Sequence, residues 1–145
     1  MCITILFGNN GIIRMPANPV KKILIVDDES SLRTLLRAVI GSEPGYDLQE
    51  ACNGDEALDL IRQEKPDLVI LDVMMPGQSG FEVCEKIKRS PELKDIIVLI
   101  LTAKGQKTDQ EWASSVGADC FLSKPFSPLE LINLIENLMT NKTAR

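Results

Sequence analysis

The sequence predicts a doubly wound α/β fold, in which a five-stranded parallel sheet is covered by five helices. Two of its apolar stretches, residues 68–71 and 96–101, are continuous runs rich in β-branched side chains, as expected for strands buried on both faces. From about residue 21 onward, such stretches alternate with segments of helical spacing. Strands that alternate with helices form right-handed βαβ units, and these units build one parallel sheet.

The composition is that of one soluble globular domain. The chain has 145 residues, of which 44% are hydrophobic and 26% charged. A net charge of −5 argues against binding nucleic acid through its phosphates and favours a divalent cation or a basic partner. The four cysteines form no C-x-x-C pair and histidine is absent, which argues against a zinc site or a disulfide framework and favours reduced thiols. No apolar run is long enough to span a membrane, so we expect a cytoplasmic protein.

The domain is expected to cover residues 20–140. Residues 1–19 show no clear periodicity and are expected to form a loosely ordered N-terminal extension, and residues 141–145 a frayed polar tail. Composition also raises the hypothesis that Met15 is the natural start. Mass spectrometry of protein from its native host would test it, because an intact residue 1–14 segment would rule it out.

The first half of the domain contains two strands and two helices. An apolar run at residues 22–26 predicts the first strand, and the helical spacing that follows stops at Gly41, a residue favoured at helix ends. Residues 46–51 alternate between apolar and polar side chains, which predicts a weaker strand at an edge of the sheet. Asn53, with Glu56 three residues later, is a capping box that opens the second helix.

The second half begins with the buried central strand and adds three helices and two strands. We expect these remaining elements in chain order: a helix opened by the capping box Ser79–Glu82, a strand at 96–101, a polar helix at 106–116 stopped by Gly117, a short strand at 120–122, and a last helix capped by Ser127 with Pro128 at its first position.

Reactive polar side chains follow four of the five predicted strands. They are Asp27 and Asp28, Asp72, Thr102 and Lys124, and in a doubly wound sheet the carboxyl ends of the strands form the ligand crevice. Three neighbouring carboxylates repel one another unless a hard cation such as Mg²⁺ lies among them. Each residue alone has a plainer explanation as a cap, a turn or a solvated amine. Together they predict a metal-assisted site where a carboxylate attacks a phosphoryl group.

Four segments, read together, resemble the motifs of response regulator receiver domains of two-component signalling. They are Ile23-Leu-Ile-Val-Asp-Asp-Glu29, Leu71-Asp-Val-Met-Met-Pro-Gly77, Leu101-Thr-Ala103 and Lys124-Pro-Phe126, and the resemblance covers residues 21–139. It implies a flavodoxin-like sheet in the strand order 2-1-3-4-5.

The resemblance also implies roles for individual residues. Asp72 would be the phosphoacceptor, and Asp28, Asp72 and the backbone carbonyl of Met74 would bind Mg²⁺, with Asp27 acting through water. Thr102 and Lys124 would contact the phosphoryl group. On activation, the aromatic Phe121 would turn inward together with Thr102.

The sequence departs mildly from the family at one of these positions. Phe121 stands where the family often has tyrosine, so the switch would depend on packing without a hydroxyl hydrogen bond. Met74 and Lys104 occupy positions that tune dephosphorylation in this family, and we expect an effect on the lifetime of the acyl phosphate.

We therefore expect a signalling phosphoacceptor that assists its own phosphorylation and slow dephosphorylation, without being an enzyme in the usual sense. Its donor would be a histidine kinase or a histidine phosphotransfer protein. Phosphorylation would reshape the surface formed by the fourth and fifth helices and the strand between them. Because no output region follows Arg145, we expect a stand-alone regulator that acts on a downstream protein and binds no nucleic acid directly.

Three other functions share features with this sequence. A haloacid-dehalogenase-type phosphatase needs a general acid two residues after its nucleophile, where this chain has Met74. A flavodoxin or dinucleotide-binding module needs a phosphate-cradling loop after the first strand, where this chain has acidic residues. A non-phosphorylated pseudo-receiver, acting as an interaction module, is the serious alternative, although it would be expected to lack Asp72, Lys124 or the acidic pair.

Trp112, the only tryptophan, falls in the most polar predicted helix. It either covers the edge of the core together with Val116, or anchors a partner on the face of the fourth and fifth helices, since tryptophan is enriched at binding hot spots. The variant Trp112→Ala separates these interpretations, because core loss lowers stability and anchor loss lowers partner binding.

Overall fold

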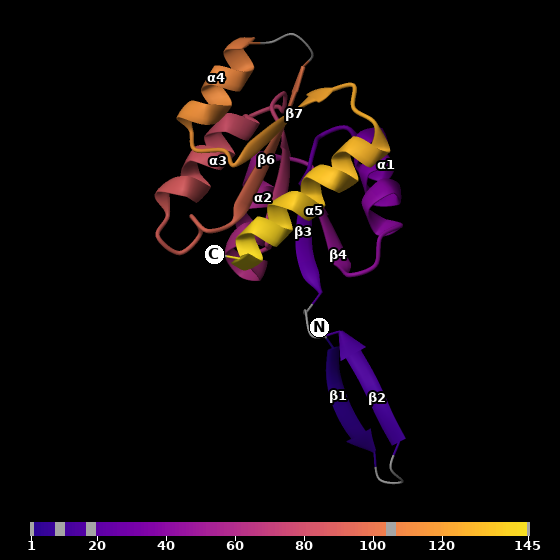
Figure 1. Ribbon diagram of the computed structural model, residues 1–145. Helices are drawn as coiled ribbons and strands as arrows, with labels where there is room; N and C mark the ends of the chain where they lie inside the picture. The colour runs from indigo at the N-terminus through magenta and orange to yellow at the C-terminus, as the bar shows by residue number, and fades with distance from the viewer. Residues whose placement is uncertain (1, 8–10, 17–19, 104–106, 145) are drawn as a thin grey trace.

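The computed structural model describes the backbone of residues 2–7, 11–16, 20–103 and 107–144, and the side chains of residues 20–103 and 111–140. Five parallel strands form the central sheet (Figure 1). These strands are β3 (Lys21–Val26), β4 (Tyr46–Ala51), β5 (Leu68–Asp72), β6 (Ile97–Ala103) and β7 (Cys120–Lys124). The five helices are α1 (Ser30–Gly41), α2 (Gly54–Glu64), α3 (Gly80–Arg89), α4 (Lys107–Ser115) and α5 (Pro128–Ala144).

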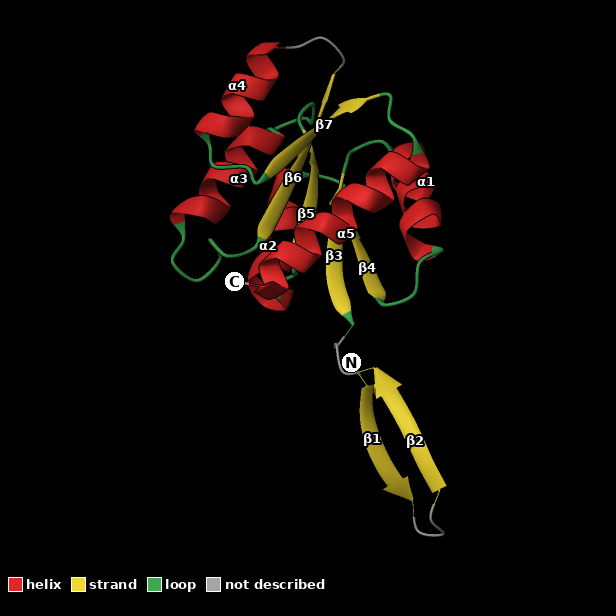
Figure 2. Cartoon of the chain, in the orientation of Figure 1, coloured by secondary structure: helices red, strands yellow, loops and turns green. Residues whose placement is uncertain are grey.

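The sheet has the order β4-β3-β5-β6-β7, and each neighbouring pair is parallel. Numbered by chain order within the sheet, this is the order 2-1-3-4-5, so the predicted fold class is confirmed. The strand at residues 46–51 lies at an edge, as predicted. Strands β3 and β5 are parallel neighbours, so their carboxyl ends lie side by side (Figure 2). The strand order reverses between them, which is where doubly wound sheets bind their ligands.

Two apolar layers hold the helices to the sheet, one on each face. The first joins α2, α3 and α4 to side chains such as Leu24, Val69 and Val98. The second joins α1 and α5 to their sequence neighbours Ile23, Leu68 and Ile97. Alternate residues of the central strands β3, β5 and β6 therefore enter opposite layers, which explains the continuous apolar runs in these strands.

The predicted N-cap residues are present at the starts of α2, α3 and α5. The side chains of Asn53, Ser79 and Ser127 each accept a hydrogen bond from the backbone amide three residues later, at 2.8, 3.3 and 3.0 Å. These bonds satisfy amides that the first helical turn leaves unpaired. The bond at Ser79 fixes where α3 begins, after the loop that follows Asp72.

Two segments differ from the expectations for the chain ends. Strands β1 (Cys2–Phe7) and β2 (Gly11–Pro16) pair as an antiparallel hairpin within residues 1–19, where no element was expected. Helix α5 continues through the expected polar tail to Ala144. Gln106 and Lys104, named above, lie outside the described residues. Among the described residues, no helix has the length and apolar character needed to cross a membrane.

Candidate functional site

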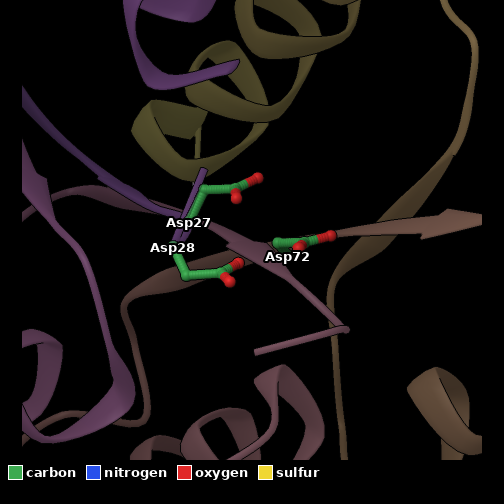
Figure 3. A group of neighbouring side chains, drawn as sticks. All are labelled: Asp27, Asp28 and Asp72. Carbon is green, nitrogen blue, oxygen red and sulfur yellow. The ribbon is translucent and has the colours of Figure 1, made fainter. Parts of the chain in front are cut away.

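Three aspartates gather at the carboxyl end of the sheet, where the sequence predicted a site. Asp27 and Asp28 directly follow β3, and Asp72 ends β5 (Figure 3). One carboxylate oxygen from each residue lies within 4.8 Å of the others. Asp27 and Asp72 are buried while Asp28 is exposed, so the cluster is open to solvent on one side only.

Lys124 provides the positive charge of this cluster. Its Nζ donates a hydrogen bond of 2.7 Å to Asp72 Oδ1 and lies 4.0 Å from Asp27 Oδ2. Lys124 ends β7, which is separated from β5 by β6, so its long side chain reaches across one strand. The peptide bond that follows, between Lys124 and Pro125, is cis.

The two oxygens of Asp27 have different surroundings. Oδ1 accepts a hydrogen bond of 2.8 Å from the backbone amide of Glu29. Oδ2 is buried and accepts no hydrogen bond from the described residues. Burial raises the pKa of Asp27 from 3.8 to about 6, with the amide of Glu29 opposing it, the carboxylate of Asp72 adding to it, and Lys124 opposing it. Asp27 is therefore a carboxyl group whose charge is poorly compensated.

Asp72 is in a similar position but has a direct cationic partner. Burial raises its pKa, while the hydrogen bond and charge of Lys124 lower it and the charge of Asp28 raises it again. A carboxylate that is buried and in contact with a single lysine is a nucleophile that few water molecules can solvate. The arrangement allows Asp72 to attack an electrophile that arrives from the solvent side, next to Asp28.

The donor set fits a magnesium ion. Three carboxylates offer only oxygen ligands, which Mg²⁺ prefers, and the open side leaves room for the water molecules that this ion retains. The buried Oδ2 of Asp27, which lacks a hydrogen-bond donor, would be satisfied by a metal-bound water. The backbone carbonyl of Met74 follows Asp72 by two residues, and its role as a ligand stays a prediction.

Thr102 and Phe121 lie on the two strands beyond Asp72. Thr102 is 1% exposed at the carboxyl end of β6, and its Oγ1 lies 3.3 Å from the Oγ of Ser123 on β7. Phe121 lies two residues before Ser123 and is 36% exposed, so in this structure its ring is outward. The predicted coupling of Thr102 to an inward rotation of Phe121 stays a prediction.

Sequence reasoning missed three residues that support the cluster. Gly80 allows α3 to start against Asp72, because a Cβ on Gly80 would overlap the Asp72 carbonyl oxygen and lie 3.0 Å from its carbon. Ser123 is the partner of Thr102. Arg33 donates from Nη1 to the backbone carbonyl of Asp27 at 2.6 Å and is itself held by Glu50 at 3.2 Å. A glycine at the first position of a capped helix was the one signal available.

The surroundings of Trp112 agree in part with both predicted roles, covering the edge of the core and anchoring a partner. Its ring stacks on Phe81, with centroids 4.9 Å apart and planes inclined by 30°, so it covers the edge of a core residue. The residue nevertheless stays 59% exposed. Val116, the proposed packing neighbour one turn later, is buried in the same apolar layer as Phe81.

Comparisons with known proteins agree on one family. The model of the response regulator receiver domain matches residues 23–136. The probable transcriptional regulator ycf27 of Guillardia theta is 44% identical over 126 residues, which are 86% of this chain and 48% of that protein. The phosphate regulon transcriptional regulatory protein PhoB of Pseudomonas aeruginosa is 45% identical over 112 residues, which are 77% of this chain and 48% of PhoB.

Solved structures show the same fold. The chemotaxis protein CheY4 of Vibrio cholerae superposes with a TM-score of 0.76 at 30% identity, covering 82% of this chain and 98% of that one. The signal receiver domain of a signal transduction histidine kinase from Syntrophus aciditrophicus gives 0.78 at 31% identity, covering 83% and 91%. The chain spans about half the length of the curated relatives named above, and the same fold occurs in proteins of different names.

Proposed function

This chain belongs to the response regulator receiver family of two-component signalling, and we propose that it receives its signal as a phosphoryl group on Asp72. The observation that carries the proposal is the surroundings of this carboxylate. Asp72 is buried at the end of the central strand, bonded at 2.7 Å to Lys124, and within 4.8 Å of two further carboxylates. Such a cluster of like charges is costly for a fold unless a cation binds there.

The expected donor is a phosphohistidine on a histidine kinase or a histidine phosphotransfer protein. A carboxylate oxygen of Asp72 forms a bond to phosphorus while the bond from phosphorus to the imidazole nitrogen breaks, and that nitrogen keeps the electron pair. Lys124 then pairs with a phosphoryl oxygen and the hydroxyl of Thr102 donates to another. Asp28, Asp72 and the Met74 carbonyl would hold Mg²⁺, with Asp27 acting through water, and the bound ion would supply positive charge to the phosphoryl oxygens.

The same residues account for the two later steps of the cycle. Hydrolysis of the acyl phosphate by water at the solvent side of Asp28 returns Asp72 to the carboxylate, slowly. Before that, the hydrogen bond from Thr102 to the phosphoryl group biases Phe121 inward, and the surface of α4, β7 and α5 changes. The protein is thus a signalling phosphoacceptor, and its output is a contact with a downstream protein.

Direct binding of nucleic acid is not part of this proposal. The net charge of −5 opposes phosphate contacts by residues 1–145. The curated relatives are named as transcriptional regulators, and the chain spans about half of their length. The expectation that the described domain contacts proteins only therefore stays a prediction about this domain.

Intact mass measurement after incubation with Mg²⁺ and a small-molecule acyl phosphate tests the proposal. We expect a single phosphoryl adduct that requires Mg²⁺ and disappears in Asp72→Asn, which keeps the shape of the side chain. Asp119→Asn is the matched control, because Asp119 also bonds a lysine at 2.7 Å but lies at the amino end of the sheet. That variant should form the adduct normally. An unmodified wild-type protein that is folded and binds Mg²⁺ would support the pseudo-receiver interpretation instead.

A further inference from the structure

A groove of about 580 Å³ opens between the loop that follows Asp72, the start of α3, and the exposed tryptophan of α4. Its lining includes Met74, Pro76, Ser79, Phe81, Glu82 and Trp112. Most of these side chains are apolar, and two of them are conspicuously exposed, Met74 at 76% and Trp112 at 59%. Exposed side chains of this size beside a groove are a feature of interaction surfaces.

The indole ring is presented to solvent on one side. Phe81 is 3% exposed and packs against one face of the Trp112 ring, with centroids 4.9 Å apart. The stack on Phe81 restricts the Trp112 side chain, so this side chain would lose little conformational entropy when a partner binds to the other face of its ring. An aromatic face of this kind attracts cations and planar groups.

Glu82 is the charged residue among the lining residues that the structure describes. The other charged side chains of α3 are each engaged: Glu85 with Arg89 at 2.7 Å, Lys86 with Gln78 at 2.5 Å, and Lys88 with Asp119 at 2.7 Å. Among the residues whose side chains the structure describes, Glu82 has no hydrogen-bond or ion-pair partner for its carboxylate. Its backbone amide is held by Ser79 at 3.3 Å, which fixes the residue at the rim.

We propose that this groove docks a protein partner through an arginine side chain, stacked on the free face of Trp112 and paired with Glu82. Charge complementarity identifies the occupant, because the lining joins an aromatic face, a thioether and one free carboxylate in a chain of net charge −5. Arginine fits better than lysine, since its planar guanidinium can stack on an indole and bond a carboxylate with two donors at once. Apolar residues beside the arginine would cover Met74 and Pro76.

The proposal does not require phosphorylation of Asp72, so either can fail while the other stands.

The fluorescence of Trp112, the only tryptophan, reports occupation of the groove directly. The probe is the peptide acetyl-Gly-Leu-Arg-Leu-Gly-amide, and the matched peptide replaces arginine by citrulline, which keeps the shape and removes the charge. We expect a saturable change in emission with the arginine peptide and binding at least about fivefold weaker with the citrulline peptide. Equal affinity for the two peptides, or no change with either up to about 5 mM, would overturn the proposal.

Two variants test whether the carboxylate of Glu82 pairs with the arginine of the peptide. Glu82→Gln should lower the affinity for the arginine peptide by about the same fivefold factor and leave the citrulline peptide unchanged. Glutamine is also favoured at this capping position, so α3 should stay intact. Glu85→Gln, on the same helix but outside the groove lining, should bind as wild type. An equal loss of affinity in both variants would overturn the proposal, because the peptide would then respond to the overall negative charge of the protein. An emission that changes with protein concentration alone would also overturn it, because a second copy of the chain would then occupy the groove.

Discussion

The two ends of the parallel sheet each contain a lysine–aspartate pair at the same distance, 2.7 Å, but in different surroundings. At the amino end, Lys88 Nζ also donates to the carbonyls of Ile96 and Lys94, at 2.7 and 3.1 Å, and Asp119 Oδ2 also accepts from the amide of Val98 at 2.8 Å. All three protons of the ammonium group are used. This pair is complete without any ligand.

At the carboxyl end, the pair of Lys124 and Asp72 faces two further carboxylates. Asp27 Oδ2 is buried there without a hydrogen bond from the described residues, and the pKa values of Asp27 and Asp72 are raised mainly by burial. An ion pair stabilises a fold when protein groups supply all of its hydrogen bonds, and it can serve as a binding site when some of its polar atoms lack partners. The following predictions test this difference, beginning with the largest expected effect.

Gly80→Ala should cause the largest loss, because it changes the backbone beneath the incomplete pair. A Cβ at this position would overlap the carbonyl oxygen of Asp72, and backbone cannot move aside as a flexible side chain can. We expect the free energy of unfolding to fall by about 3 kcal/mol, with a lower yield of the Asp72 adduct. Urea denaturation measures the first effect and intact mass the second.

Gly41→Ala is the control for this prediction. A Cβ on Gly41 would make ordinary contact with Leu48 Cδ1 at 3.7 Å, so its stability should stay within about 0.5 kcal/mol of wild type. Equal stability of the two variants would mean that α3 can start elsewhere without cost.

Lys88→Met should cost about 2 kcal/mol, because it leaves two carbonyls and part of Asp119 without their donor. The loss should be the same with and without Mg²⁺, since this pair is remote from the acidic cluster in the sheet. Thermal unfolding in both conditions measures it, with Lys94→Met, an exposed lysine, as control. A loss that Mg²⁺ reverses would contradict the assignment of a purely structural role to the amino end.

The residues of the acidic cluster and Gly80 differ in whether the sequence alone could identify them. Asp27, Asp28, Asp72 and Lys124 were found because they directly follow predicted strands, and strand ends of a parallel sheet converge whatever the details of packing. Gly80 was not found, because its role depends on how closely α3 approaches the carbonyl of Asp72. Contacts that pair distant segments follow from the packed structure and leave no local pattern.

The ends of the chain show the same limit. The dipeptide Asn10-Gly11 is typical of a hairpin turn, but apolar and polar residues alternate too weakly on either side of it to predict the strands β1 and β2. The polar residues 141–144 were expected to fray because they have no apolar periodicity, and α5 continues through them. Arg33 was expected only as part of the first helix, and its bond to the carbonyl of Asp27 depends on Glu50 of β4.

Asp27→Asn should stabilise the metal-free protein. The pKa of Asp27 is raised from 3.8 to about 6 in the folded state, so its contribution to the free energy of unfolding is full below about 3.8 and is lost as pH rises through about 6. At about pH 7 the variant should therefore be more stable than wild type by roughly 1–2 kcal/mol, and the difference should disappear near pH 4.

Urea denaturation with EDTA across this pH range measures the effect of Asp27→Asn. Asp59→Asn, an exposed aspartate on α2, is the control and should change little. Mg²⁺ should reduce the advantage of Asp27→Asn, because the ion stabilises wild type more than the variant. A variant that is less stable than wild type at every pH would show that Asp27 is already compensated.

Trp112→Ala should have the smallest effect on stability, about 1 kcal/mol, because the ring contributes its stack on Phe81 while remaining 59% exposed. Trp112→Phe, which keeps an aromatic contact, should lose less than half of that. Thermal unfolding followed by circular dichroism measures both, since the variants lack the fluorescent residue. A loss above about 3 kcal/mol would make Trp112 a core residue comparable to Phe81. The expected small loss would mean that the exposed face of Trp112 is not needed for the core and is available to a partner in the groove beside the loop that follows Asp72.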